Sequence, residues 1–304
     1  MRLILNKHMD GAAQKLLPEL ILFFAFLILS ASIACAQQLI IPTTDSLPPN
    51  TLQAQSGKQE EEEEFINPAR PGVSNPAEFQ KPGVLQIEYG YDASFRASGF
   101  RLQQTAPVAL RFAATSHLLF ELDLDTVNSQ TDERRTHMTG IGDTRIGFQI
   151  VMLKDTEKHP ALAFAYYAKL PTASTEKGLG TGRFDHKIIT LLSKKFGETD
   201  VDFNAAYLIV GREEERGWVT GGQAALGISR EFENNYGFEA ELSGQTKDDA
   251  QPPGLYALGA LTYKVNKRFV FDSGMRFGLT QDAPRVGVFA GVTVGVADFY
   301  RKKR

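Results

Sequence analysis

The chain has 304 residues and a formal net charge of −3 at pH 7, and 42% of its residues are hydrophobic. This charge balance argues against a nucleic-acid-binding surface, and a single cysteine excludes a disulfide scaffold and a cysteine-based zinc site. The mean hydropathy of −0.21 excludes a bundle of transmembrane helices. It is compatible with a β-barrel, in which only alternate strand residues face lipid.

The first segment has the form of a Sec signal peptide. A positively charged start precedes the apolar run Leu20–Leu29, and the small residues at 34–36 offer a cleavage site. A transmembrane anchor needs about 20 apolar residues and is the weaker interpretation. Another alternative makes Cys35 a lipidation site, although residues 32–34 lack the usual leucine. We predict a cleaved signal peptide over residues 1–36 and an exported protein.

The second segment, residues 37–82, is rich in proline and glutamate. It holds 7 of the 14 prolines and the acidic run Glu60–Glu64. Few apolar residues are available to offset the entropy lost on ordering, so we predict a flexible exported tail. The alternative is a plug that folds into the lumen of a barrel.

From Gly83 onward, segments of about ten residues alternate apolar and polar positions, as transmembrane β-strands do. Phe120, Leu122 and Leu124, for example, alternate with acidic residues. Segment 185–196 is apolar on both parities, so its two faces cannot be assigned. The twelve segments lie at about residues 85–92, 104–114, 120–125, 143–152, 160–170, 185–196, 201–209, 218–230, 236–243, 255–265, 268–279 and 286–296.

The connections between these segments alternate in character. Odd connections tend to be long and charged, such as 128–140 and 172–183, whereas even ones tend to be short, such as 197–199 and 266–267. A moderate first connection is expected around 94–101. This sorting is typical of a transmembrane barrel, whose two rims face different compartments. With both termini in the periplasm, the odd connections become extracellular loops.

We therefore predict an all-β, antiparallel transmembrane β-barrel of about twelve strands over residues 83–300. Because backbone groups in hydrocarbon must all pair, the sheet must close, with apolar side chains toward lipid and polar ones toward the lumen. A basic tail, residues 301–304, follows the aromatic pair Phe299 and Tyr300.

Four short motifs resemble those of the MetA-pathway phenol-degradation family of outer-membrane β-barrel proteins. They are GIGDTRIG at 140–147, KLPT at 169–172, LGTG at 179–182 and GLTQDAP at 278–284. The resemblance covers roughly residues 83–297 and implies passage of small, often aromatic or hydrophobic, compounds across the outer membrane. It carries over no catalytic or binding motif. The chain departs from the pattern of outer-membrane strands at its end, because its terminal aromatic residues are followed by the basic tail.

Charged residues of both signs occupy the positions predicted to face the lumen. Either they form a constriction that selects solutes, or they form a ladder of cross-strand ion pairs that holds the barrel rigid, and we favour the ladder for most of them. A cation site at the acidic residues of strand 120–125 would have poor ligand geometry. The candidates are Glu88, Arg111, Glu121, Asp123, Asp125, Asp143, Arg145, Glu239, Glu241, Asp272 and Arg276.

No other motif indicates chemistry. The glycine-rich stretch 178–182 has no following helix to hold a phosphate, and no two histidines have metal-ligand spacing. A lipase using Ser116, His117 or His186 lacks any feature that places a nucleophile beside a base. We predict no enzyme activity, no cofactor and no metal.

The predicted function is a bacterial outer-membrane channel or transporter that passes small molecules by diffusion through a mixed-charge lumen. Its expected partners are outer-membrane lipids, the barrel-assembly machinery and a small-molecule solute, with no nucleic acid. Two alternatives remain: a closed structural or surface barrel whose extracellular loops carry the function, and a soluble exported barrel that binds a lipophilic ligand.

Overall fold

The computed structural model describes residues 64–97, 99–211, 217–246 and 253–300. The predicted signal peptide with Cys35, residues 37–63 of the predicted tail and the basic tail 301–304 lie outside these residues. Among the described residues, no helix is long and apolar enough to cross a membrane.

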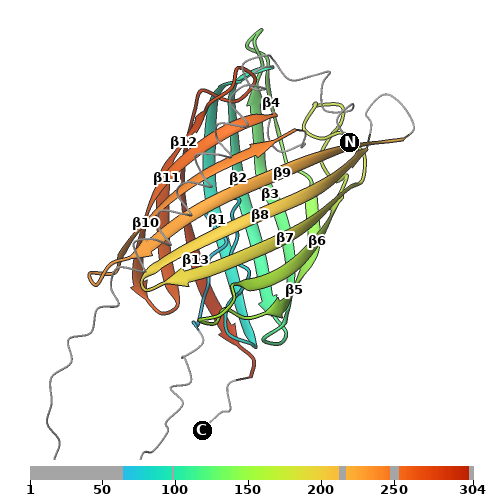
Figure 1. Ribbon diagram of the computed structural model, residues 1–304. Helices are drawn as coiled ribbons and strands as arrows, with labels where there is room; N and C mark the ends of the chain where they lie inside the picture. Colours follow the sequence, from blue (N-terminus) through green and yellow to red (C-terminus); the bar gives the residue numbers. More distant parts are fainter. Residues whose placement is uncertain (1–63, 98, 212–216, 247–252, 301–304) are drawn as a thin grey trace, which may run out of the picture. The chain divides into compact units, whose positions relative to one another are not determined.

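The fold is a closed, antiparallel β-barrel, which confirms the predicted fold class (Figure 1). β1 pairs with β2 on one side and with β13 on the other, so the sheet closes into a ring. The short strand β4 extends the pairing of β3 beyond β5, so 12 strands form the closed ring. The strands are β1 Val84–Ala97, β2 Phe100–Ala113, β3 Leu118–Thr131, β4 His137–Gly140, β5 Thr144–Leu153, β6 Ala161–Leu170, β7 Asp185–Phe196, β8 Thr199–Gly211, β9 Trp218–Glu231, β10 Tyr236–Gln245, β11 Gly254–Asn266, β12 Phe269–Gly278 and β13 Val286–Asp298.

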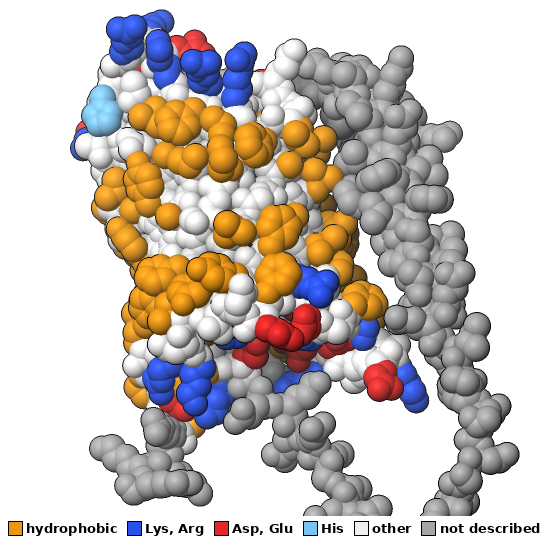
Figure 2. Space-filling model, turned by 90° about the vertical axis from the view of Figure 1, so that its left-hand side faces the viewer, with side chains coloured by type: hydrophobic (Ala, Val, Ile, Leu, Met, Phe, Trp, Pro, Cys, Tyr) orange, Lys and Arg blue, Asp and Glu red, His pale blue; other side chains and the backbone are white. Residues whose placement is uncertain are grey.

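The two faces of the wall have the polarity predicted for a membrane barrel. Phe203 points outward and is 43% exposed, whereas its neighbour Asn204 points into the lumen and is 4% exposed. Phe120 and Phe271 are likewise exposed on the outside. Apolar side chains cover the outer face, and charged side chains gather above and below them (Figure 2). The apolar residues therefore lie where lipid would be, and the polar ones line the interior.

The barrel has two different rims. We call the end with Gly83 and Asp298 the terminal rim, and the opposite end the loop rim. The terminal rim carries the connections 114–117, 154–160, 197–198, 232–235 and 267–268, and the loop rim carries 98–99, 132–136, 171–184, 212–217, 246–253 and 279–285. Apart from 98–99, connections at the loop rim are generally the longer ones, as the sequence indicated.

Two predicted loops at the loop rim are shorter than expected. β1 and β2 continue through the predicted loop 94–101, where Phe95 pairs with Leu102 and Ala97 with Phe100. The predicted loop 128–140 is also mostly strand, because the end of β3 pairs with β4. Hairpins that extend beyond the lipid need no lipid-facing apolar residues, so the alternation that marks the other strands is absent from them.

The double apolar parity of β7 has a structural cause. Ile188 faces outward, whereas Ile189 and Leu191 are buried inside the barrel. They form an apolar cluster with alanines of β6, against which Phe79 packs. β7 therefore has apolar side chains on both faces, one directed outward toward lipid and the other packed in the interior cluster.

Residues 64–82, which we call the inner segment, lie against the inner face of this wall. Ala77, for example, is fully buried in the apolar cluster of β6 and β7. For these residues, this placement replaces the predicted flexible tail. Their ordering depends on contacts with distant strands, and the local composition could not reveal those contacts.

Candidate functional site: the barrel lumen

The inner segment makes a circuit of the inner wall. Its hydrogen-bond partners lie in turn on β1, β12, β10, β8, β7, β5 and β2. It begins and ends near the terminal rim, where the backbone N–H of Lys81 donates to the carbonyl of Glu64. The lumen near this rim is therefore occupied by the protein's own chain.

The circuit begins with backbone contacts to β1. The amide N–H of Asn67 donates to Gln86 Oε1 at 2.9 Å, and Gln86 Nε2 donates back to the Asn67 carbonyl at 2.9 Å. Ala69 N donates to Glu88 Oε1, also at 2.9 Å. Two alternate lumen-facing side chains of β1, Gln86 and Glu88, thus bind the backbone of the inner segment.

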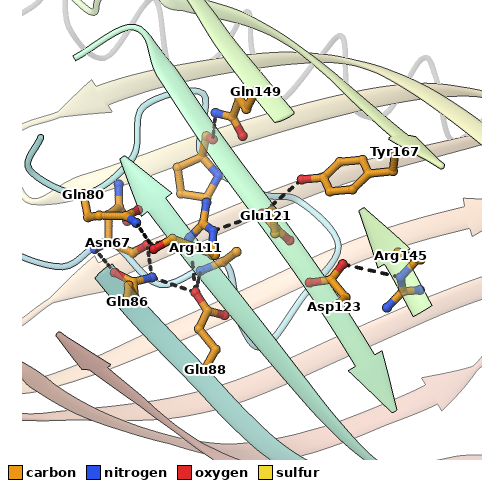
Figure 3. A network of polar contacts seen from close by, with 12 residues as sticks. Asn67, Gln80, Gln86, Glu88, Arg111, Glu121, Asp123, Arg145, Gln149 and Tyr167 are labelled. Carbon is orange, nitrogen blue, oxygen red and sulfur yellow. Dashed lines mark hydrogen bonds and ion pairs between the residues drawn. The ribbon is translucent and has the colours of Figure 1, made fainter. Parts of the chain in front are cut away.

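Arg111 of β2 is the centre of the buried polar network beside this contact (Figure 3). Its side chain is 1% exposed and lies 3.2 Å from both Glu88 Oε1 and Glu121 Oε2. It also donates to the Asn67 carbonyl at 2.9 Å, and Tyr167 donates its hydroxyl to Glu121 at 3.1 Å. The network joins four strands and the inner segment, and the guanidinium group of Arg111 is at its centre.

Arg70 anchors the next part of the inner segment to β12. Its Nε and Nη2 donate to the two carboxylate oxygens of Asp272, each at 3.1 Å. The guanidinium lies over Gly90 and Gly291, where a Cβ atom would overlap it. The parallel, two-point contact fixes both the position and the plane of the arginine head group.

A turn at 72–74 is held by Glu241 of β10. Its Oε2 atom accepts the backbone N–H of Val73 at 2.6 Å, and the N–H and hydroxyl of Ser74 at 2.8 Å each. Asn204 of β8 donates to the Val73 carbonyl at 3.0 Å. Gly72 lies so close to Glu241 and Glu239 that a side chain there would overlap both carboxylates.

The last part of the circuit returns along β5 and β7 to β2. Gln149 Nε2 donates to the Ala77 carbonyl at 2.8 Å, and Ala77 N donates to Ser193 Oγ at 2.7 Å. Gln80 then donates to the backbone carbonyl of Arg111, and Lys81 pairs with Asp298. Each turn of the inner segment therefore has a specific acceptor or donor on the wall.

The half of the lumen nearer the loop rim contains a second set of ion pairs. Lys169 Nζ lies 2.7 Å from Asp185 and 3.3 Å from Asp143, and it donates to Thr181 of the β6–β7 connection. Leu179 of the same connection is buried. This connection, which contains the long predicted loop 172–183, is therefore tied to the wall from inside.

The predicted lumen residues all lie on strands or breaks of the wall, and most are paired. Asp123 pairs with Arg145, and Arg276 pairs with Asp92, which was not among the predicted candidates. Within the described residues, the side chains of Asp125 and Glu239 make no hydrogen bond or ion pair. Sequence reasoning missed the partners on the inner segment, Arg70 above all, because that segment was assigned to the tail.

The other motifs form no composite site in the described part of the chain. Ser116 Oγ lies 3.0 Å from His117 Nδ1 on the terminal rim, but no described contact joins this histidine to a carboxylate. His186 is near the other rim, hydrogen-bonded to Tyr166 on the outer face. Among the described residues, no three His, Cys, Asp or Glu side chains gather as metal ligands do.

Comparisons with known structures agree with the fold. An outer membrane channel from Pseudomonas putida F1 matches with a TM-score of 0.59 and 14% sequence identity, covering 74% of this chain and 98% of that chain. The KdgM porin in complex with disordered oligogalacturonate matches with a TM-score of 0.46 and 11% identity, covering 70% of this chain and 99% of that one. No curated protein sequence matches.

The family comparison is more direct. A family model described as "Putative MetA-pathway of phenol degradation" matches residues 69–295. The match covers β1 to β12 and most of β13, and it leaves out the first residues of the inner segment. It confirms the resemblance seen in the short sequence motifs, and the chain belongs to this family.

Proposed function

We propose that the protein is an outer-membrane channel that passes small molecules through its polar lumen. The observation that carries the proposal is the inverted wall, with Phe203 and its equivalents outside and Asn204, Glu88 and Arg111 inside. A soluble barrel would bury its phenylalanines in the interior. The fold, which is that of bacterial outer-membrane barrels, supports the same placement.

We further propose that the solutes include small aromatic or hydrophobic compounds. The family description supports this, and so do apolar areas on an otherwise charged wall. Leu258 and Ala260 of β11 form a buried cluster with Phe289 of β13, and Arg276 lies over the Phe289 ring. The residues of this cluster are at most 5% exposed, so a solute ring with a polar substituent would reach this apolar face and the nearby hydrogen-bonding groups only when lumen side chains shift.

For a solute to pass, the inner segment either moves away or stays in place and forms one wall of a narrow path. The segment is held mainly by hydrogen bonds and ion pairs, which exchange with water more readily than a packed apolar core. No energy-coupling motif is present in the sequence, so diffusion is the proposed mechanism.

The test is reconstitution of the purified protein in planar lipid bilayers and in liposomes. We expect stepwise ionic current and swelling of liposomes in small aromatic solutes. Protein-free membranes and heat-unfolded protein serve as controls. Absence of current and swelling, with heat-modifiable migration proving a folded barrel, would contradict the channel.

That negative result would favour a second candidate, a closed structural barrel with function in its external loops. The observation in its favour is the inner segment itself, whose circuit of contacts fills the lumen near the terminal rim. The soluble ligand-binding alternative has no comparable support, because it does not account for the exposed apolar outer face (Figure 2).

A further inference from the structure

Three residues that face the lumen form a continuous row across the strands that close the barrel. Gly90 of β1 pairs directly with Gly291 of β13, and Gly291 pairs directly with Asp272 of β12. The two glycines leave bare backbone, and the carboxylate of Asp272 stands at one end of it. The row is therefore a flat-floored slot with a negative charge at its end.

Arg70 fills this slot. Its guanidinium contacts the floor so closely that a Cβ at Gly90 would overlap Nη1, and one at Gly291 would overlap Nε. Nε and Nη2 make the two-point contact with Asp272, and Nη2 lies 3.5 Å from the Ala290 carbonyl. Asp272 is 6% exposed, so its carboxylate is largely shielded from water, and the Arg70 side chain is 16% exposed.

The shape and the charge of the slot suit a planar cation. A guanidinium is flat, weakly hydrated and able to donate two parallel hydrogen bonds to one carboxylate, whereas an ammonium is round and strongly hydrated. The wall could have placed alanine or serine at either glycine position without breaking the strands. Glycine at both positions is what the flat head group requires.

We propose that the slot formed by Gly90, Gly291 and Asp272 is a guanidinium-binding site, and that Arg70 occupies it as a pin that fixes the inner segment. The slot accepts the planar guanidinium group and discriminates against ammonium. The inference concerns how the lumen is kept filled and holds whatever solute the barrel passes.

The first experiment measures how often the inner segment opens. Val73→Cys, in full-length protein with Cys35→Ser, places a single thiol beside the turn held by Glu241, and a water-soluble maleimide reports its exposure. We expect Arg70→Gly to speed labelling at least about tenfold, because tenfold corresponds to only about 1.4 kcal/mol of lost binding energy. Arg70→Lys keeps the positive charge but cannot make the planar two-point contact with Asp272. The thiol should therefore also be labelled faster in this variant than in the protein with Arg70.

Arg276→Ala is the matched control. Arg276 also lies on the lumen side of β12 and pairs with an aspartate, Asp92, but within the described residues no hydrogen bond or ion pair joins it to the inner segment. Its removal should leave the labelling rate within about twofold of wild type. Heat-modifiable migration confirms that each variant is a folded barrel.

The second experiment tests the slot itself. Guanidinium chloride, far below denaturing concentration, should raise the thermal unfolding temperature of Arg70→Gly relative to the double variant Gly90→Ala, Arg70→Gly, whose slot the added Cβ fills. Sodium chloride at the same ionic strength should shift the unfolding temperatures of the two variants equally.

Four results would overturn the inference. Unchanged labelling in Arg70→Gly, or equal acceleration in Arg276→Ala, would show that Arg70 is not a pin. Wild-type labelling in Arg70→Lys would show that the planar fork is not needed. Equal response of the single and double variants to guanidinium would show that the slot does not bind it. None of these readouts depends on conductance, so they stand apart from the channel test.

Discussion

At the scale of single residues, the lumen is organised by arginines that each serve several partners. Arg111 pairs with Glu88 and Glu121 and also donates to the Asn67 carbonyl. Because its side chain is almost completely buried, the two carboxylates depend on it for charge compensation. Removing one partner of such a buried set costs far more than removing an exposed ion pair.

We therefore expect Arg111→Ala to lower the free energy of unfolding by about 3–5 kcal/mol. Two buried carboxylates would lose their counter-charge, and the Asn67 carbonyl would lose a donor. Urea titration of the protein in lipid vesicles, followed by heat-modifiable migration, measures the change.

Lys195→Ala is the control for that measurement. Lys195 and Asp200 form an exposed pair with a separation of 4.0 Å. Its loss should cost less than about 1 kcal/mol. Equal losses for the two variants would mean that the Arg111 network contributes little to stability.

At the scale of elements, the inner segment behaves as an added lining, each part of which meets a complementary position on the wall. Where side chains of the segment approach the wall closely, the wall residue is glycine: Phe65 lies on Gly295, and Ser74 lies on Gly227. Where the segment offers backbone N–H groups, the wall supplies Glu88 and Glu241. The wall sequence is therefore adapted to this segment.

Glu241→Gln should loosen the turn at 72–74. The amide keeps the shape of the side chain but loses the charge that strengthens three hydrogen bonds, each worth about 1.5–3 kcal/mol when one partner is charged. We expect the thiol of Val73→Cys, in full-length protein with Cys35→Ser, to be labelled by the water-soluble maleimide several times faster in the folded barrel.

Glu239→Gln provides the comparison on the same strand and the same face. Glu239 makes no hydrogen bond or ion pair within the described residues, so the labelling rate should stay at the value measured without this substitution. If the thiol is labelled at equal rates in the two variants, Glu241 does not hold the turn.

The strands could be predicted from the sequence much more completely than the inner segment. The period of two that identifies β3 or β13 is a local property of the chain. The contacts of the inner segment instead join residues far apart, such as Ser74 and Glu241, and local composition does not record them. One available signal was the set of glycines on the inner face of β13, which a wall facing only water would not need.

At the scale of the whole molecule, the barrel is an inverted core, with its largest exposed apolar surface outside and its charges inside. The predicted class and strand number followed from this alternation, because lipid on one side and water on the other impose it on every strand. The candidate lumen residues could be identified in the same way. Their pairing could not, since a partner depends on strand register and on the inner segment.

Met275→Lys should therefore destabilise the barrel in a bilayer by about 2–4 kcal/mol, because it places a charge on the lipid face near the middle of β12. Met275 is 43% exposed on that face. Urea-induced unfolding from vesicles, compared with wild type, gives the difference.

Val296→Lys makes the same change close to the terminal rim, where a lysine reaches the headgroups, and should cost no more than about 1 kcal/mol. If both variants are as stable as wild type in vesicles, the outer face does not contact lipid, and the membrane placement fails.

The position of Arg70 in the slot has a consequence for the order in which the protein folds. Gly90 belongs to the first strand and Gly291 to the last, so the floor beneath the guanidinium does not exist until the two ends of the sheet have met. The stretch that precedes the first strand in the chain must therefore wait for the final hairpin before it can settle. Arg70 can therefore occupy its final position only in a barrel whose first and last strands have already paired.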